Sequence, residues 1–228
     1  MASKRLERIF VEGFIEHIEQ DFQLVTEREA PDFVLSDARG QFGLEVVQVF
    51  RDRRQSGSPS KAGESGRDKC LRRLAGRYYS RSGLPLLVQA IIADGFKFEL
   101  HALSDRLIEE RNDEPWQSSE FSLGPDTKFY LTPLPPEAGR YSRWVCVNNS
   151  VDWQGWLSVD DIALTVQEKS RKLAKYRTAI DRVSLLLVVD VTQNSGMLRW
   201  PHDALSPKAR GFDAVYLYLH PLEARRLA

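Results

Sequence analysis

The sequence predicts an α/β fold in which a mixed central sheet is flanked by helices. Three observations support this class: an amphipathic helical pattern near the N-terminus, short alternating strands after it, and a long helical pattern leading into an apolar strand. The chain has 228 residues, of which 42% are hydrophobic, and this is enough for a substantial core. We therefore expect residues 1–228 to form a single domain.

The N-terminal part predicts one helix and three strands. Residues 4–20 place their apolar side chains on one broad face at a period of 3.6 residues, as in a helix packed on a sheet. Residues 22–26 alternate as a first strand. The segments 32–36 and 41–49 then predict a hairpin around the four residues 37–40.

The middle of the chain predicts shorter elements and an insertion. A Gly-, Ser- and Pro-rich loop is expected at 56–66 and a helix at 67–80. Residues 86–93 have the length and apolar content of a buried strand, and 96–100 is its expected hairpin partner. The loop-rich segment that follows indicates an inserted region at about 94–157.

The C-terminal part predicts a long helix followed by two strands. Ser158 provides an N-cap oxygen, and two aspartates follow it in the first turn. We expect this helix to run to about Asp181 and to lead into a strand at 184–191, with a final strand at 212–220.

The composition argues against several classes of protein. The apolar runs are far shorter than the roughly 20 residues that a membrane span needs, and the first residues lack an apolar signal-peptide core. We therefore expect a cytoplasmic protein with no membrane partner. Cys70 and Cys146 have no histidines at zinc-ligand spacing. No Walker loop, dinucleotide-binding glycine pattern or zinc-protease motif is present.

Charge is balanced over the whole chain but not along it. The formal net charge is zero, which gives no overall electrostatic argument for binding nucleic acid. Residues 51–81 nevertheless contain ten cations and three anions, whereas residues 105–126 contain seven acids and two cations. The basic stretch lines a phosphate-binding surface or is simply a solvated face, and the sequence leaves both interpretations open.

Two acidic residues are expected to face each other across the predicted hairpin. With 37–40 as the loop, Asp32 lies opposite Glu45 on one face of the sheet. Directly opposed side chains have Cβ atoms about 4.5 to 5.5 Å apart, and like charges there repel. A divalent cation bound by both carboxylates would remove the repulsion. The alternative is that Asp32 is a turn residue and Glu45 faces solvent.

A lysine interrupts the apolar face of the predicted C-terminal helix. Lys169 lies in a stripe with steps of four and three residues, made by Ile162, Val166, Lys169, Leu173, Tyr176 and Ile180. Burying an isolated ammonium group is costly. Lys169 therefore either extends along the stripe to water or reaches carboxylate or phosphate groups at the edge of the sheet.

This order of elements resembles the PD-(D/E)XK nuclease superfamily, which has the restriction-endonuclease-like fold. The resemblance lies in a strand that opens with Pro31-Asp32 and a strand that carries Glu45, and it covers residues 4–50 well and 158–220 more loosely. It implies that Asp32 and Glu45 bind Mg2+ (or Mn2+), together with the main-chain carbonyl of Val46. It also implies hydrolysis of phosphodiester bonds in DNA or RNA, with a homodimer as an option for cutting two strands.

The sequence departs from the family pattern at one position. The family places a lysine two residues after the glutamate, and this chain has Val47 there. Either Lys169, which lies on the long helix, performs the role of that lysine, or the site has decayed and no longer cleaves nucleic acid. Decay would leave an inactive nuclease-fold protein that acts as a nucleic-acid-binding or protein-interaction module. Arg67 or Lys69, on the helix that follows the hairpin, are the competing replacements.

The same resemblance indicates which cations would contact nucleic acid. They lie in the basic stretch after Glu45 and beside Lys169 on the long helix. The candidates are Arg53, Arg54, Arg67, Lys69 and Lys172.

Overall fold

The chain forms two compact units in a computed structural model that describes residues 4–51, 58–93, 95–147, 155–200 and 207–228. One unit comprises Met1–Ser58 and Asp152–Ala228, and the other comprises Pro59–Val151. The second unit overlaps the insertion expected at 94–157, and it also contains the helix and the strand that precede that insertion. Each unit has its own sheet and its own core.

The first unit is built on a six-stranded mixed sheet, as the sequence predicts. The strand order is β1-β2-β3-β9-β11-β12. The first three strands pair antiparallel, β9 lies parallel to both β3 and β11, and β12 pairs antiparallel with β11. The strands are β1 (Gln23–Glu27), β2 (Phe33–Asp37), β3 (Gly40–Gln48), β9 (Val183–Asp190), β11 (Val215–His220) and β12 (Glu223–Arg226).

The hairpin of β2 and β3 has the register that its sequence predicts. Phe33 pairs with Leu44, and Asp37 pairs with Gly40, so two residues are left to form the turn between the strands. Gly40 has a φ of 103°, a conformation that favours glycine. The strands alternate with a period of two, so this register fixes which residues of β3 face each side of the sheet.

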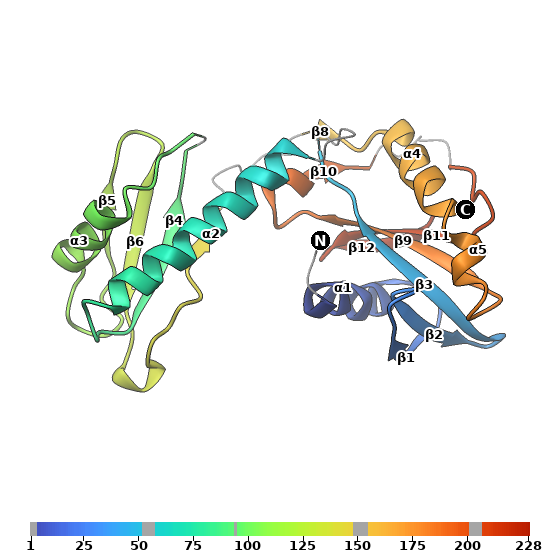
Figure 1. The fold of residues 1–228 in the computed structure, drawn as a ribbon, viewed down its shortest axis with the longest axis horizontal. Coiled ribbons are helices and arrows are strands. Elements are labelled where there is room, and N and C mark those ends of the chain that lie inside the picture. The colour runs from blue at the N-terminus through green and yellow to red at the C-terminus, as the bar shows by residue number, and fades with distance from the viewer. Residues whose placement is uncertain (1–3, 52–57, 94, 148–154, 201–206) are drawn as a thin grey trace. The chain divides into compact units, whose positions relative to one another are not determined.

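Helices cover both faces of this sheet (Figure 1). Helix α1 (Lys4–His17) packs Phe10 and Phe14 against Leu186 and Val188 of β9. On the other face, α4 (Val159–Ser170) and α5 (Leu173–Tyr176) pack against the alternate residues of β9, including Leu187. All eight residues of β9 are buried, as expected for a strand covered on both faces.

The long C-terminal helix is shorter than predicted and is interrupted. The amide of Lys172 donates to the carbonyl of Lys169 at 3.0 Å, a spacing of three residues that tightens the backbone between α4 and α5. The apolar stripe continues across the interruption, because Val166, Leu173 and Tyr176 are all buried. The predicted end near residue 181 is therefore wrong, whereas the inward face is correct.

Short elements complete this unit between its longer ones. The 3-10 turn η2 (Asn194–Gly196) follows β9. Strands β8 (Gly155–Trp156) and β10 (Leu198–Arg199) form a separate two-stranded parallel sheet. Strand β12 was not expected from the sequence.

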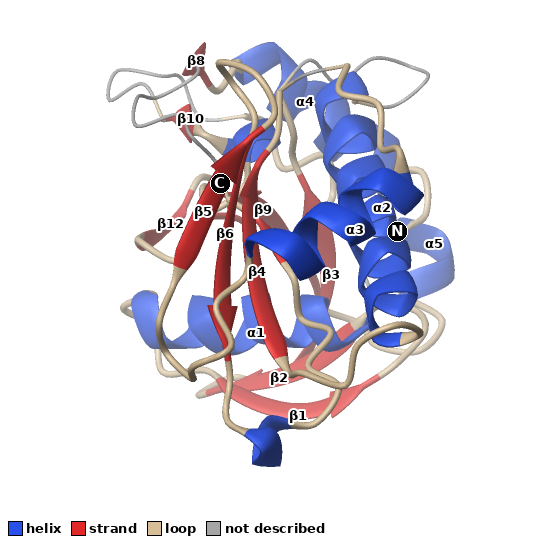
Figure 2. Ribbon diagram, turned by 90° about the vertical axis from the view of Figure 1, so that its left-hand side faces the viewer, coloured by secondary structure: helices blue, strands red, loops and turns tan. Residues whose placement is uncertain are grey.

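The second unit packs two helices against one face of a four-stranded sheet (Figure 2). The strand order is β5-β6-β4-β7. The core contains Leu74 and Tyr78 of the first helix, Leu107 of the second and Phe129 of the sheet. The elements are α2 (Pro59–Tyr79), β4 (Leu86–Ile91), α3 (Leu100–Glu110), β5 (Ser119–Ser122), β6 (Lys128–Pro133), the 3-10 turn η1 (Pro136–Ala138) and β7 (Val145–Cys146).

Two sequence predictions for this unit are wrong. Residues 96–100 do not pair with β4, whose antiparallel partner is the more distant β6. Helix α2 begins at Pro59, eight residues before the predicted start. Proline is well suited to the first turn of a helix, where its missing N–H group has no partner to lose.

In the described ranges no helix has the length and apolar character of a membrane span.

Candidate active site

Glu45 is a buried acid on the face of the sheet that α4 covers. It pairs in register with Leu185 of β9, and Leu185 belongs to the core beneath α4. The residue is only 5% exposed. Val47 lies two residues further along β3 and packs against the same core. A carboxylate in such surroundings needs a positive partner or hydrogen-bond donors.

Lys169 supplies that positive partner from α4. Its Nζ lies 2.7 Å from Oε1 of Glu45, and its side chain is 21% exposed. The helix is fixed at its start by Ser158, whose side-chain oxygen accepts a hydrogen bond from the amide of Asp161. The structure thus brings Glu45 and Lys169 together across 124 positions of sequence.

Tyr176 of α5 approaches Glu45 from the same side. Burial, together with a hydrogen bond to Glu45 and the negative charges of Glu45 and Asp32, raises the pKa of its hydroxyl far above the ordinary value of 10.0. The hydroxyl therefore stays protonated. Glu45 thus accepts a hydrogen bond from the ammonium group of Lys169 and has the phenol of Tyr176 nearby.

Asp32 lies immediately before β2, beside the first residues of the hairpin ladder. Its Oδ2 accepts a hydrogen bond from the amide of Val46 at 2.9 Å. The preceding residue, Pro31, packs over Gly43, where an added Cβ would collide with the proline ring. Asp32 is thus hydrogen-bonded to Val46, the residue that directly follows Glu45 on β3.

Lys4, at the start of α1, occupies the second oxygen of Asp32. Its Nζ lies 2.9 Å from Oδ1 of Asp32 and 3.5 Å from Oε2 of Glu7, and it also donates to the carbonyl of Arg28 at 3.0 Å. Burial lowers the pKa of Lys4, but the hydrogen bond and charge of Asp32 outweigh it and raise the pKa above 10.5. Each of the two predicted acids therefore has a lysine partner.

Glu7 is a third acid in this cluster, and the sequence analysis missed it together with Lys4. Burial and the negative charge of Asp32 raise the pKa of Glu7, and the charge of Lys4 opposes them. A sequence signal was available, because Lys4 and Glu7 continue toward the N-terminus the spacing of the buried Val11 and Phe14. A Lys-Glu pair on the extension of a buried stripe indicates a polar site at the end of the core.

The remaining predicted residues lie in other parts of the chain. Arg53 and Arg54 lie outside the described residues. Arg67 and Lys69 belong to helix α2 of the other unit. Lys172 is exposed at the interruption between α4 and α5. The predicted ligand Val46 contributes its amide to Asp32, as described above.

Carboxylates are the ligands that hard divalent cations prefer, but the acids of this cluster do not form a complete metal site by themselves. Within the described ranges, no group of three or more His, Cys, Asp or Glu side chains is arranged to hold a metal ion. Mg2+ is commonly held by one or two carboxylates plus water and substrate phosphate, and Asp32 and Glu45 fit this more modest requirement. A metal ion that bound Oδ1 of Asp32 would have to displace Lys4 from it.

Comparison with protein-family models, with curated proteins and with solved structures finds no match to this chain. The cluster of Asp32, Glu45, Lys4 and Lys169 is therefore interpreted from its own chemistry.

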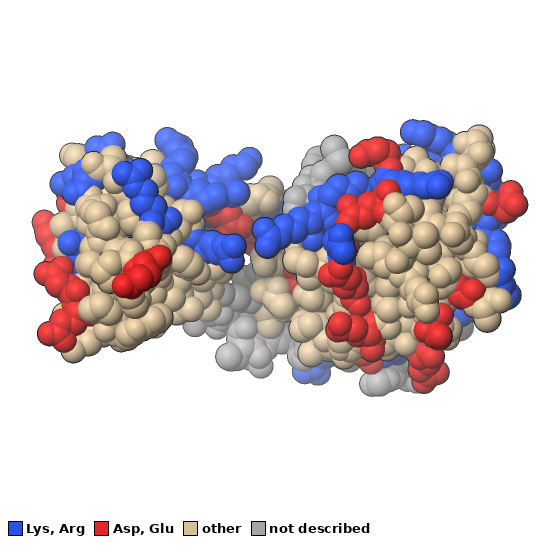
Figure 3. Space-filling view, turned by 90° about the horizontal axis from the view of Figure 1, so that it is seen from below, with Lys and Arg blue, Asp and Glu red and all other residues tan. Residues whose placement is uncertain are grey.

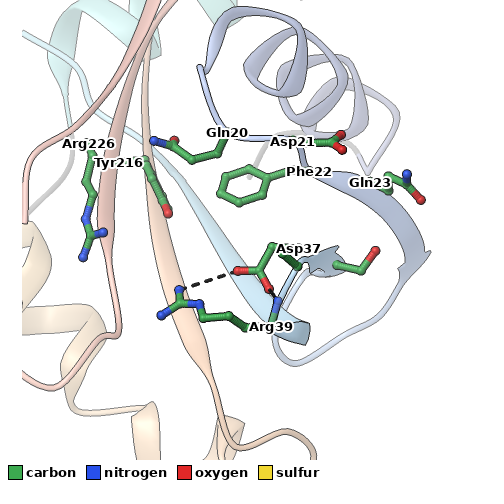
Figure 4. A pocket seen from close by; sticks show the side chains of 10 residues that line it. Gln20, Asp21, Phe22, Gln23, Asp37, Arg39, Tyr216 and Arg226 are labelled. Atoms are coloured by element: carbon green, nitrogen blue, oxygen red, sulfur yellow. Dashed lines mark hydrogen bonds and ion pairs between the residues drawn. The ribbon is translucent and has the colours of Figure 1, made fainter.

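An open pocket of about 510 Å3 lies elsewhere, at the turn of the β2–β3 hairpin (Figure 4). It is lined by Asp37 and Arg39 of the hairpin, and by Asp21 and Tyr216, among others. The pocket is separated from Asp32 by the length of β2, about 17 Å for five residues. The residues beside this pocket have a structural role. Arg182 donates to both oxygens of Asp37 at 3.1 and 2.6 Å and so holds the turn of the hairpin.

We predict that Lys169→Met lowers the free energy of unfolding by about 3 kcal/mol at pH 7, because it leaves Glu45 buried without its cation. The double variant Glu45→Gln/Lys169→Met is expected to cost less than half as much. Urea unfolding followed by circular dichroism measures both values. Lys175→Met, an exposed lysine of α5, is the control and should change the stability by less than about 0.5 kcal/mol. A double variant that is destabilised as much as Lys169→Met would contradict this account of the ion pair.

We predict that Asp37→Asn destabilises the chain by about 1 kcal/mol at pH 7 and by less at pH 3. The hydrogen bonds from Arg182, opposed by burial and assisted by the amide of Arg39, lower the pKa of Asp37 below 3.8. The stabilisation is therefore complete above that value and is lost as the pH falls through the lowered pKa. Urea unfolding at the two pH values is the measurement, and Asp21→Asn removes an exposed acid of the same pocket as the control. An equal loss at both pH values would contradict the prediction.

Proposed function

We propose that the chain is a divalent-metal-dependent nuclease of the PD-(D/E)XK type that hydrolyses phosphodiester bonds in DNA or RNA. The observation that carries the proposal is the ion pair between Glu45 and Lys169, 2.7 Å long, next to Asp32 on the same hairpin. The chain lacks the lysine of the family motif at Val47, and an ammonium group nevertheless reaches the glutamate from α4. The mixed sheet with helices on both faces is compatible with this family.

Asp32, Glu45 and the main-chain carbonyl of Val46 are the groups that would hold Mg2+ or Mn2+. Such an ion activates a water molecule as a nucleophile and neutralises charge on the phosphate. The hydrogen bond from Lys169 holds the carboxylate of Glu45 in position. The amide of Val46 does the same for Asp32. The protein's part is to keep both acids oriented before the substrate binds.

Lys169 has a second role in this proposal. Its side chain is partly exposed, so its ammonium group can approach a phosphate while it remains close to Glu45. Negative charge accumulates on the phosphate oxygens during hydrolysis, and a positioned cation stabilises that charge most effectively at a buried site.

Lys4 would leave Asp32 when the metal binds. Glu7 already lies 3.5 Å from its Nζ and provides an alternative partner on the same helix.

We predict that the wild-type chain cleaves a mixed panel of DNA and RNA oligonucleotides with Mg2+ or Mn2+, and that Asp32→Asn and Glu45→Gln abolish cleavage. Lys169→Met is expected to lower the cleavage rate by about 100-fold or more, because it removes a charge needed in the transition state. Gel electrophoresis of labelled oligonucleotides measures the rates. Lys175→Met should cleave at the wild-type rate, and full activity in the Asp32 and Glu45 variants would refute the assignment.

A second candidate is a catalytically inactive nuclease-fold protein that works as a nucleic-acid-binding or protein-interaction module. The observation in its favour is that both acids already have lysine partners, together with the lack of a three-ligand metal group in the described part of the chain. In this case Lys4 and Lys169 are permanent structural cations rather than parts of a catalytic cycle.

Calorimetric titration with Mn2+ separates the two candidates. A nuclease site is expected to bind Mn2+, to lose binding in Asp32→Asn, and to bind about tenfold more tightly in Lys4→Met, since the competing ammonium group is gone. A chain that binds no Mn2+ either as wild type or as Lys4→Met would favour the inactive module. Arg5→Met, an exposed cation of the same helix, is the control.

A further inference from the structure

From Gly66 onward, the exposed residues of α2 are four cations, two glycines and one acid, Asp68. Lys69, Arg72, Arg73 and Arg77 are all exposed, and steps of three and four residues place them on one side of the helix. Two glycines of the helix, Gly66 and Gly76, share this face. In the left-hand body of Figure 3, Lys and Arg side chains gather on one side and most visible Asp and Glu side chains lie elsewhere. This basic face of α2 is thus predominantly positive, with Asp68 at its edge.

The glycines of the basic face are not explained by packing within the protein. A Cβ added at Gly66 or Gly76 would meet nothing within 4 Å. Glycine in the interior of a helix is destabilising relative to alanine. Glycines at these positions do, however, allow a ligand to approach the backbone of the helix between the cations.

The opposite side of α2 is fully used by the core. Leu71, Leu74 and Tyr78 are completely buried, and Tyr79 is 7% exposed. Both tyrosines pack against the buried Trp144. The tyrosine pair is therefore not a platform for stacking bases. Proteins that bind single strands rely on exposed aromatic side chains of that kind.

We propose that the basic face of α2 binds the phosphate backbone of double-stranded DNA. The inference rests on the proposed function for its substrate class and selects duplex DNA within it. The major groove of B-form DNA is about 12 Å wide and admits an α-helix, whereas the major groove of duplex RNA is too narrow for side chains. Arginine and lysine on one helical face supply contacts to phosphate groups that carry no sequence information.

This arrangement separates binding from cleavage within the chain. The acids and Lys169 belong to the unit of residues 1–58 and 152–228, and α2 belongs to the unit of residues 59–151. The basic face should therefore hold DNA in the absence of any metal ion.

The test is fluorescence anisotropy of a labelled 24-base-pair DNA duplex with the full chain in EDTA, over a range of salt concentrations. The double variant Arg72→Ala/Arg73→Ala should weaken binding by at least tenfold at low salt. It should also reduce the slope of log K against log salt by about 2, since each lost phosphate contact contributes about 0.9. The matched control Lys97→Ala/Arg140→Ala removes two exposed cations of the same unit outside α2 and should leave the slope unchanged.

A third variant distinguishes binding from helix stability. Gly76→Gln adds an uncharged side chain to the centre of the basic face and should raise the thermal stability of α2, because glutamine is a better helix former. It should nevertheless weaken DNA binding severalfold by blocking close approach.

Equal affinity for the duplex and for a single strand or duplex RNA, or equal losses in the double variant and its control, would overturn the proposal. Duplex binding without cleavage would refute only the nuclease assignment, whereas cleavage unaffected by Arg72→Ala/Arg73→Ala would refute only this inference.

Discussion

Glu45 is a carboxylate buried in a sheet, and the placement of its cation determines much of the first unit. The period of β3 places Glu45 beneath α4, so a donor must come from that helix, and the ammonium group of Lys169 meets it at 2.7 Å. This requirement fixes the rotation of α4 about its axis, because the same face must also bury Ile162 and Val166. The inward face of α4 continues into α5 despite the break between the two helices, so Tyr176 of α5 approaches the same carboxylate. One polar contact therefore orients an otherwise apolar layer.

The two lysines of the cluster come from opposite faces of the sheet. Lys169 belongs to α4, and Lys4 belongs to α1. Their targets, Glu45 and Asp32, are joined through the amide of Val46 on β3. The cluster is thus assembled from three layers of the fold, and each layer contributes at least one charged group. Pro31 packed over Gly43 fixes the approach of the chain to Asp32.

Local patterns were sufficient to predict the parts of the fold that obey short-range rules. The register of β2 and β3 followed from the centre of the predicted turn and the two-residue period, although the turn has two residues and not the four expected. The inward face of α4 followed from its apolar stripe. The partner of β4 could not be predicted in this way, because β6 lies more than 35 residues further along the chain and only the folded sheet brings the two together. The start of α2 was missed because Gly-, Ser- and Pro-rich sequence usually indicates a loop. Lys4 and Glu7 could not be predicted from the apolar face of α1, because both precede its first buried residue, Phe10.

The pairing of each acid with a lysine also bears on how the chain folds. Lys4 and Lys169 supply two positive charges beside the carboxyl groups of Asp32, Glu45 and Glu7, so the protein itself provides the counter-charges of the cluster. Proteins whose acidic clusters lack such partners depend on bound ions to hold like charges together, and chelators unfold them. Here the polypeptide provides its own counter-ions before any ligand arrives. The native state can consequently form without regard to the supply of metal.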